Sequence, residues 1–235
     1  MTEAGKGDPP DSDGVPEELE RELERFLPEP NEGDTPGVDR APYEAVAGRV
    51  QELLAERTGG HNHIDTRSGE KITPFEPDCE KIELEDIAHG LSNVGRFAGQ
   101  GKDFYSVARH SVHVSLEVEA RGGSKEARRY ALVHDAAEAY LSDVPGPVKK
   151  SLPGYKHAER RLDETIVGAL GLDATDEERE LTEEADEVVG KHELSVQFPD
   201  GGHDEPDLSH DPKRVDGREN DKRLFLERSE GLQLG

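Results

Sequence analysis

The chain lacks several of the features that define common protein classes. Its 235 residues contain one cysteine, Cys79, and no tryptophan, and only 31% of them are hydrophobic. A single cysteine excludes an intramolecular disulfide framework and a zinc cluster built from cysteines. No stretch of about 18 consecutive apolar residues is present to form a membrane-spanning helix. The N-terminus has no basic stretch followed by an apolar run, so no secretory signal is visible. These absences predict a cytoplasmic protein with no membrane partner.

Basic residues are also scarce. Lysine and arginine together number 29, against 54 acidic residues, which gives a net charge of −25. Such a chain is repelled by a nucleic-acid backbone, and no basic patch with interleaved aromatic residues offsets the repulsion. We therefore expect no nucleic-acid partner. The simplest interpretation of the acidic residues is a well-solvated surface. Their excess also resembles that of halophilic archaeal proteins, adapted to a high-salt cytoplasm.

The acidic residues are unevenly distributed. They are concentrated in residues 1–40 and 200–220, which are rich in Pro, Gly, Asp and Glu and have no apolar periodicity. Segments of this composition bury too little apolar surface to fold alone. The sequence therefore predicts a disordered acidic tail over 1–40, a folded domain over 41–199 and an acidic, mostly flexible segment over 200–235.

The periodicity of apolar residues favours helices almost everywhere else. The fold class predicted is all-α, a single helical bundle with one short irregular or hairpin segment near 61–80. Ser124 is a predicted N-cap, because it follows a Gly-Gly pair and precedes an apolar-periodic stretch. The hairpin is expected to pair residues 64–66 with 71–73. Helices are expected over 17–27, 43–57, 84–91, 105–120, 125–141, 154–170, 176–197 and 224–227.

The segment 131–143 concentrates ionisable groups among alanines. The adjacent pair His134-Asp135 is followed by Glu138 and then by Asp143. Burying so many such groups on one element is costly unless their charge is compensated, and a divalent metal ion compensates it well. On a continuous helix, Glu138 lies on the same face as His134. The segment therefore predicts half of a metal site.

Two other helices offer the remaining ligands. His110 lies on the preceding helix, which a short connection makes an antiparallel neighbour. Asp186 interrupts an apolar stripe on a later helix and is the candidate carboxylate. His113 is a further candidate, but a core histidine is the simpler interpretation. A His…His-Asp…Asp pattern on three consecutive helical segments is much more specific than a single His-Asp pair.

This pattern resembles the HD-domain metal-dependent phosphohydrolases, whose name comes from the central His-Asp pair. The similarity is to the small branch that includes the bacterial 5′-deoxynucleotidases, and it covers roughly residues 61–195. Beyond the ligands, the resemblance lies in residues 85–92, 96–97, 105–111, 134–140 and 143–149.

The resemblance implies a role for each matching position. The ligands of Mn²⁺, Co²⁺ or a similar transition ion would be His110, His134, Asp135 and Asp186. Water activation and protonation of the leaving group would fall to Glu138 and Asp143. Phosphate would be bound by Arg96 and by Lys149.

The implied substrate is a small phosphate ester, a nucleoside 5′-monophosphate, and the implied assembly is a homodimer. A nucleoside triphosphate or a signalling nucleotide is the alternative substrate, and a non-catalytic nucleotide-binding module is the non-enzymatic alternative.

Each catalytic or binding assignment also has a simpler alternative. Arg96 could form a surface salt bridge, Asp143 could cap a turn, Lys149 could be solvated and Glu138 could only donate or accept a hydrogen bond. One departure from the branch is Gln100, where relatives often carry a histidine. Gln100 cannot protonate or ligate in the same way, which affects substrate recognition rather than the metal site.

Overall fold

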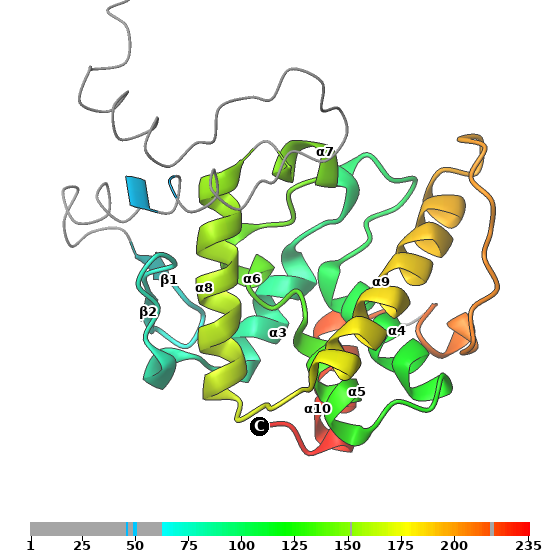
Figure 1. Cartoon of the computed structure of the whole chain (residues 1–235). Coiled ribbons are helices and arrows are strands. Elements are labelled where there is room, and N and C mark those ends of the chain that lie inside the picture. Colours follow the sequence, from blue (N-terminus) through cyan, green and yellow to red (C-terminus); the bar gives the residue numbers. More distant parts are fainter. Residues whose placement is uncertain (1–45, 47–48, 51–62, 151, 217–218) are drawn as a thin grey trace, which may run out of the picture.

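The computed structural model describes residues 46, 49–50, 63–150, 152–216 and 219–235. Helices dominate this part of the chain, and its one sheet has two very short strands (Figure 1). The all-α class is therefore confirmed. The expected helix over 17–27 lies outside the described residues, and the one over 43–57 lies almost entirely outside them.

The expected hairpin is present and is fastened to the helical domain. Strand β1 (Ile64–Asp65) pairs antiparallel with β2 (Lys71–Ile72), with Ile64 opposite Ile72. Ser68, in the turn between them, donates from its backbone N–H and its hydroxyl to the Asp86 carboxylate, at 2.9 and 2.6 Å. The hairpin is thus tied to the first turn of helix α3 (Leu84–Asn93).

Helix starts follow local capping signals. The side chains of Ser106, Ser124 and Thr175 each accept a backbone N–H bond at a helix N-terminus, and Thr175 forms a capping box with Glu178. The helices are α3 (Leu84–Asn93), α4 (Val107–Ala120), α5 (Lys125–Val133), α6 (Glu138–Leu141), α7 (Gly146–Lys149), α8 (Pro153–Ala169), α9 (Asp176–Gln197) and α10 (Asp221–Leu232).

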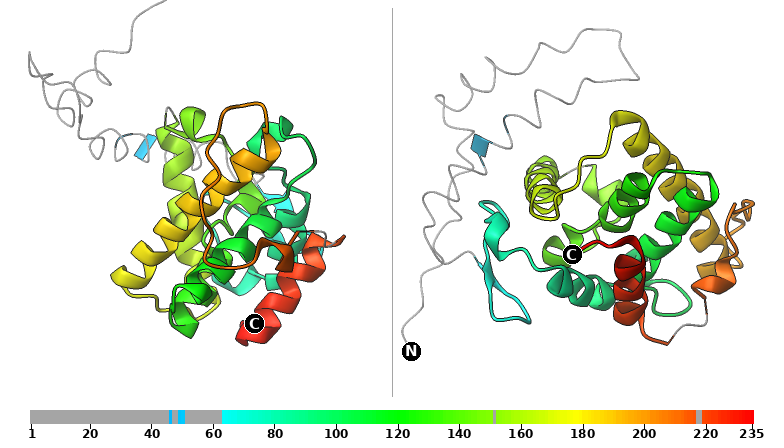
Figure 2. Two further views of the ribbon diagram at one scale, coloured as in Figure 1. Left: turned by 90° about the vertical axis from the view of Figure 1, so that its right-hand side faces the viewer. Right: turned by 90° about the horizontal axis from the view of Figure 1, so that it is seen from below.

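Helix α4 is at the centre of the domain. It packs against α3, α5, α9 and α10, and most of its residues are buried (Figures 1 and 2). Helices α8 and α9 are joined by a short connection and diverge from it (Figure 1). Leu162 and Ile166 attach α8 to the main apolar core. Among the described residues, no helix is long and apolar enough to cross a membrane.

The continuous helix expected over 125–141 is wrong. Helix α5 ends at Val133, and α6 begins at Glu138. In between, the N–H of Ala136 bonds to the carbonyl of Val133 at 2.9 Å, and that of Glu138 to Asp135 at 3.0 Å. These i to i+3 bonds tighten the chain into a 3₁₀-like turn. The His-Asp pair therefore lies in a turn between two helices, where neighbouring side chains can be aimed at one point.

The C-terminal boundary at residue 199 is also wrong. Helix α10 is a full 12-residue helix, and its Phe225 is fully buried in the main core. Leu232 and Leu234 are buried there as well, and Arg129 of α5 donates to the Leu232 carbonyl at 2.8 Å. The folded domain thus extends to the end of the chain, because the apolar residues of α10 complete the core around α4.

Candidate metal centre

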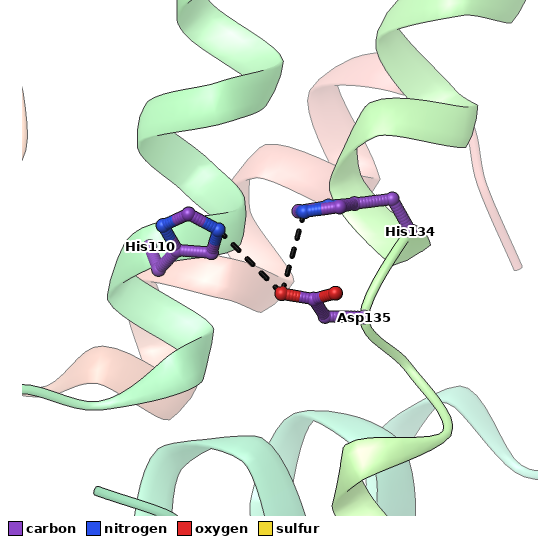
Figure 3. Close-up of side chains that lie close together, drawn as sticks. All are labelled: His110, His134 and Asp135. Atoms are coloured by element: carbon purple, nitrogen blue, oxygen red, sulfur yellow. Dashed lines mark ion pairs between the residues drawn. The ribbon is translucent and has the colours of Figure 1, made fainter. Parts of the chain in front are cut away.

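Four predicted ligands meet where α4, the turn after α5 and α9 approach one another. His110 Nε2 lies 3.5 Å from Asp135 Oδ2 and 3.0 Å from Asp186 Oδ1. His134 Nε2 lies 3.3 Å from Asp135 Oδ2 and 3.9 Å from Asp186 Oδ1. Figure 3 shows both imidazoles directed toward the Asp135 carboxylate. The structure therefore brings together residues up to 76 positions apart in the sequence.

Both imidazoles are oriented by hydrogen bonds from the opposite side of the ring. His134 Nδ1 is 2.9 Å from the Ala131 carbonyl, and His110 Nδ1 is 2.9 Å from the buried Glu193 carboxylate. A carbonyl and a carboxylate only accept, so each Nδ1 carries the proton. In their neutral forms, the rings would present Nε2 lone pairs to the cluster, an arrangement common around protein metal ions.

The cluster has the chemistry of a metal site. Both Nε2 atoms are buried and have no hydrogen-bond partner. Donor atoms of His110, His134 and Asp135 all lie within 4.8 Å of one another. Ligands at about 2.1 Å from a shared ion are roughly 3–3.5 Å apart, close to the separations here. The group could therefore hold a metal ion, with Asp186 near enough to add a second carboxylate oxygen.

Electrostatics also favour a cation here. Burial opposes a charge on His134, but the Asp135 and Asp186 carboxylates more than offset it and raise its pKa to about 10. Burial would raise the pKa of Asp186, yet His110 and His134 hold it far below the usual range. In the metal-free protein, a proton on the imidazole neutralises the carboxylates that an ion would otherwise neutralise.

Arg96 is buried beside the cluster rather than paired on the surface. Its Nε lies 3.0 Å from Glu193 Oε2, and its Nη1 lies 3.7 Å from Asp135 Oδ2. Burial opposes its charge, but Glu193 and Asp135 keep its pKa above the ordinary value. Burial would raise the pKa of Glu193, which His110 and Arg96 instead lower to about 2. Arg96 is thus a permanent cation next to the candidate ligands.

Glu138 and Lys149 also meet near the cluster. The Glu138 side chain is almost fully buried, with Lys149 Nζ 3.2 Å from its Oε1 and no hydrogen-bond partner for its Oε2. Lys149 Nζ also binds Glu159 Oε1 at 2.6 Å, so it is held by two carboxylates. Burial, together with Asp135 and Asp143, raises the pKa of Glu138 well above its usual range. The buried carboxyl can therefore hold a proton at neutral pH.

Asp143 follows α6 and is electrostatically coupled to the same groups. Burial raises its pKa; Arg96 opposes the shift and Asp135 reinforces it. The preceding residue, Ser142, has a φ of 67°, in the left-handed region that non-glycine residues seldom adopt. Its carbonyl accepts from the Tyr155 hydroxyl at 2.6 Å. This constrained turn places Asp143 close to the charges of the candidate site.

Other sequence candidates lie elsewhere. His113 is buried and hydrogen-bonded through Nδ1 to His210 Nε2 at 2.8 Å, and His210 in turn binds Glu117 at 2.9 Å. The interpretation of His113 as a core histidine is therefore confirmed. Gln100 is exposed at the end of a short 3₁₀ turn.

Glu193 was missed by the sequence analysis, although it orients His110 and pairs with Arg96. It follows Asp186 by seven residues, two turns of the same helix, which places both on one face. An acidic residue at that spacing from a candidate ligand is a signal that could have identified it.

Comparison with known proteins gives relatives but no family. No family model matches the chain. The uncharacterized protein YfdR of Escherichia coli is 42% identical over 109 residues, which cover 46% of this chain and 58% of YfdR. An uncharacterized protein of Rhodobacter capsulatus is 42% identical over 112 residues, covering 46% of this chain and 57% of that protein. The chain thus matches little more than half the length of each curated relative.

Metal binding is expected to release protons. Because the raised pKa of His134, about 10, lies above neutrality, a divalent cation must displace its proton. Apparent affinity for Mn²⁺ should rise about tenfold per pH unit between pH 7 and 9, with about one proton released per ion. Titration calorimetry in two buffers with different ionisation enthalpies measures that proton. An affinity independent of pH would contradict the arrangement of the two histidines.

Proposed function

We propose that the chain is a metal-dependent phosphohydrolase of the HD superfamily that hydrolyses a nucleoside 5′-monophosphate to a nucleoside and phosphate. The observation that carries the proposal is the cluster of His110, His134, Asp135 and Asp186. Two oriented imidazoles direct unpartnered Nε2 atoms at two carboxylates. The sequence resemblance described above supplies the reaction class.

The surrounding residues suit phosphate chemistry. A bound divalent cation would polarise the phosphoryl group and lower the pKa of a water molecule. Arg96 offers a planar set of donors that matches phosphate oxygens, and its buried pair with Glu193 fixes its orientation. In a chain of net charge −25, this local cation offsets the repulsion of a phosphate dianion.

Two carboxyl groups are available for proton transfer. Glu138 holds a proton at neutral pH and is positioned by Lys149 Nζ at 3.2 Å. It can therefore donate to the departing sugar oxygen. Asp143, coupled to Arg96 and Asp135, can accept a proton from the attacking water. Glu138 begins helix α6 and Asp143 follows its end, so the proposed general acid and general base come from opposite ends of this short helix.

The proposal is tested by direct assay. The full chain is stripped of metal with a chelator, reloaded with Mn²⁺ or Co²⁺ at high salt and incubated with a panel of nucleoside 5′-monophosphates. We expect release of inorganic phosphate that depends on the added metal. Tight nucleotide binding without hydrolysis of any phosphate ester would instead indicate a binding module.

A further inference from the structure

A cavity of about 470 Å³ adjoins the metal centre. Its lining residues come from α5, from α8 and from the first turn of α9. Its volume is in the range of small-molecule sites. Its lining includes His134, a candidate ligand, and Arg179 near the start of α9. The residues between them include Tyr130, Lys156, Arg160 and Asp163.

Arg179 is held in place without an acidic partner. Its Nε donates to the Ala174 carbonyl at 3.1 Å, and its Nη1 donates to the Tyr130 hydroxyl at 3.0 Å. Its guanidinium stacks 4.5 Å from the centre of the Tyr130 ring. In the part of the chain that the structure describes, no carboxylate lies within ion-pair distance of it. Three of its five N–H donors remain for a ligand.

An oriented arginine without a carboxylate is unusual in a chain with 54 acidic residues. Two of the three acidic residues that line the cavity, Glu159 and Asp163, do not neutralise Arg179. Glu159 is bound to Lys149 at 2.6 Å. Asp163 has a buried Oδ1 without a hydrogen-bond partner, and burial together with Glu159 raises its pKa to about 8. Lys156, Arg160 and Glu164 complete the charged part of the lining. Arg179 is therefore the group in this cavity that is suited to bind an anion.

The position of Arg179 relates it to the metal centre. It precedes Asp186 by seven residues, so the two lie two turns apart on one face of α9, roughly 10 Å along the axis. A ligand that reaches from the metal centre to Arg179 therefore needs one anionic group for the metal and another for the guanidinium.

We propose that this cavity is a second subsite and that Arg179 binds a second phosphate group of the substrate, an inference that rests on the proposed hydrolase function. The substrate class is then a nucleoside 3′,5′-bisphosphate. Its 5′-phosphate lies at the metal centre and its 3′-phosphate at Arg179. Water forms a bond to the 5′-phosphorus as the P–O5′ bond breaks, and the sugar oxygen takes up a proton. The products are inorganic phosphate and a nucleoside 3′-phosphate.

The test compares adenosine 3′,5′-bisphosphate with adenosine 5′-monophosphate. In the Mn²⁺-loaded protein, kcat/KM should be higher for the bisphosphate. Arg179→Gln should lower the ratio of the two kcat/KM values by about tenfold to a hundredfold, the usual effect of losing charge-assisted hydrogen bonds. Arg179→Lys, which keeps the charge but not the planar donors, should lower it less. Arg223→Gln is the matched control, since Arg223 is exposed and, in the described part of the chain, pairs with Glu227 on α10.

Binding is measured separately by calorimetry on the chelator-treated protein, where hydrolysis is suppressed. The subsite is supported if Arg179→Gln weakens the bisphosphate at least tenfold relative to the monophosphate while Arg223→Gln has no effect. If this Arg179-dependent binding of the bisphosphate is found but the Mn²⁺-loaded protein hydrolyses neither nucleotide, the hydrolase function is rejected and the subsite is retained. Monophosphate hydrolysis with an unchanged ratio in Arg179→Gln would reject the subsite alone. Thermal melting identifies any variant that fails to fold.

Discussion

Replacing His134 with alanine is expected to abolish metal-dependent phosphate release, lowering kcat/KM by about a thousandfold or more. Loss of a ligand removes several kcal/mol of transition-state stabilisation, and each 1.4 kcal/mol corresponds to about a factor of ten. The turn between α5 and α6 places the His134 Nε2 atom 3.3 Å from Asp135 Oδ2, so His134→Ala removes a nitrogen donor from within the cluster. The measurement is metal content by mass spectrometry together with phosphate release at saturating Mn²⁺.

Two further variants make the result specific. Asp135→Asn keeps the shape of the side chain but removes its charge, and it should lose metal and activity to a similar extent. His203→Ala removes an exposed histidine that is not part of the cluster and should behave as the unchanged protein. Metal content that falls in His134→Ala while hydrolysis persists would refute the proposed mechanism.

Local signals allowed most helices to be predicted from the sequence. The bounds of α9 follow from an N-cap at Thr175 and a continuous apolar stripe, both readable from nearby residues. The break between α5 and α6 has no such signal. Its residues keep helical dihedral angles, as at His134 with φ −60° and ψ −28°, and the segment is alanine-rich with no glycine or proline. Only the shift to i+3 hydrogen bonds marks the break. Its position depends on how the segment packs against neighbouring helices.

The C-terminal helix was underestimated for a different reason. Acidic and proline-rich residues before it match the composition of a disordered segment, whereas the apolar residues of α10 are few. What fixes α10 is contact with partners more than 90 residues away, such as Ser115, which accepts from Arg228 at 3.0 Å. Long-range contacts of this kind are not visible in local composition.

The candidate site was likewise only partly predictable from the sequence. The ligands could be inferred because a His-Asp pair in an apolar segment needs compensation, and their proximity agrees with that inference. The residues that support these ligands could not be inferred from the sequence. Glu193 lies 83 positions from His110 in the sequence, and a glutamate on a helix is normally a solvated residue. Its importance follows from full burial between an imidazole and a guanidinium.

Replacing Glu193 with alanine is therefore expected to lower both stability and metal affinity. Removing one partner of a buried ion pair typically costs about 3–5 kcal/mol, and Arg96 would keep only its longer contact, 3.7 Å, with Asp135. Loss of the acceptor for His110 Nδ1 should weaken Mn²⁺ binding by about 10- to 100-fold. Urea unfolding and metal titration measure the two effects.

Matched variants separate the two roles of Glu193. Glu193→Gln keeps an acceptor for His110 but not the charge, so metal affinity should recover more than stability. The double variant Glu193→Gln with Arg96→Met removes both charges and should recover much of the stability lost in Glu193→Gln.

The stabilising effect of Glu193 is expected to depend on pH. Its folded-state pKa, about 2, lies below its ordinary 4.5, so its contribution to the free energy of unfolding is present above pH 4.5 and is lost as pH falls toward 2. Glu193→Gln should lack that acid-dependent loss, and an unchanged pH profile would show that the buried carboxylate does not stabilise the fold.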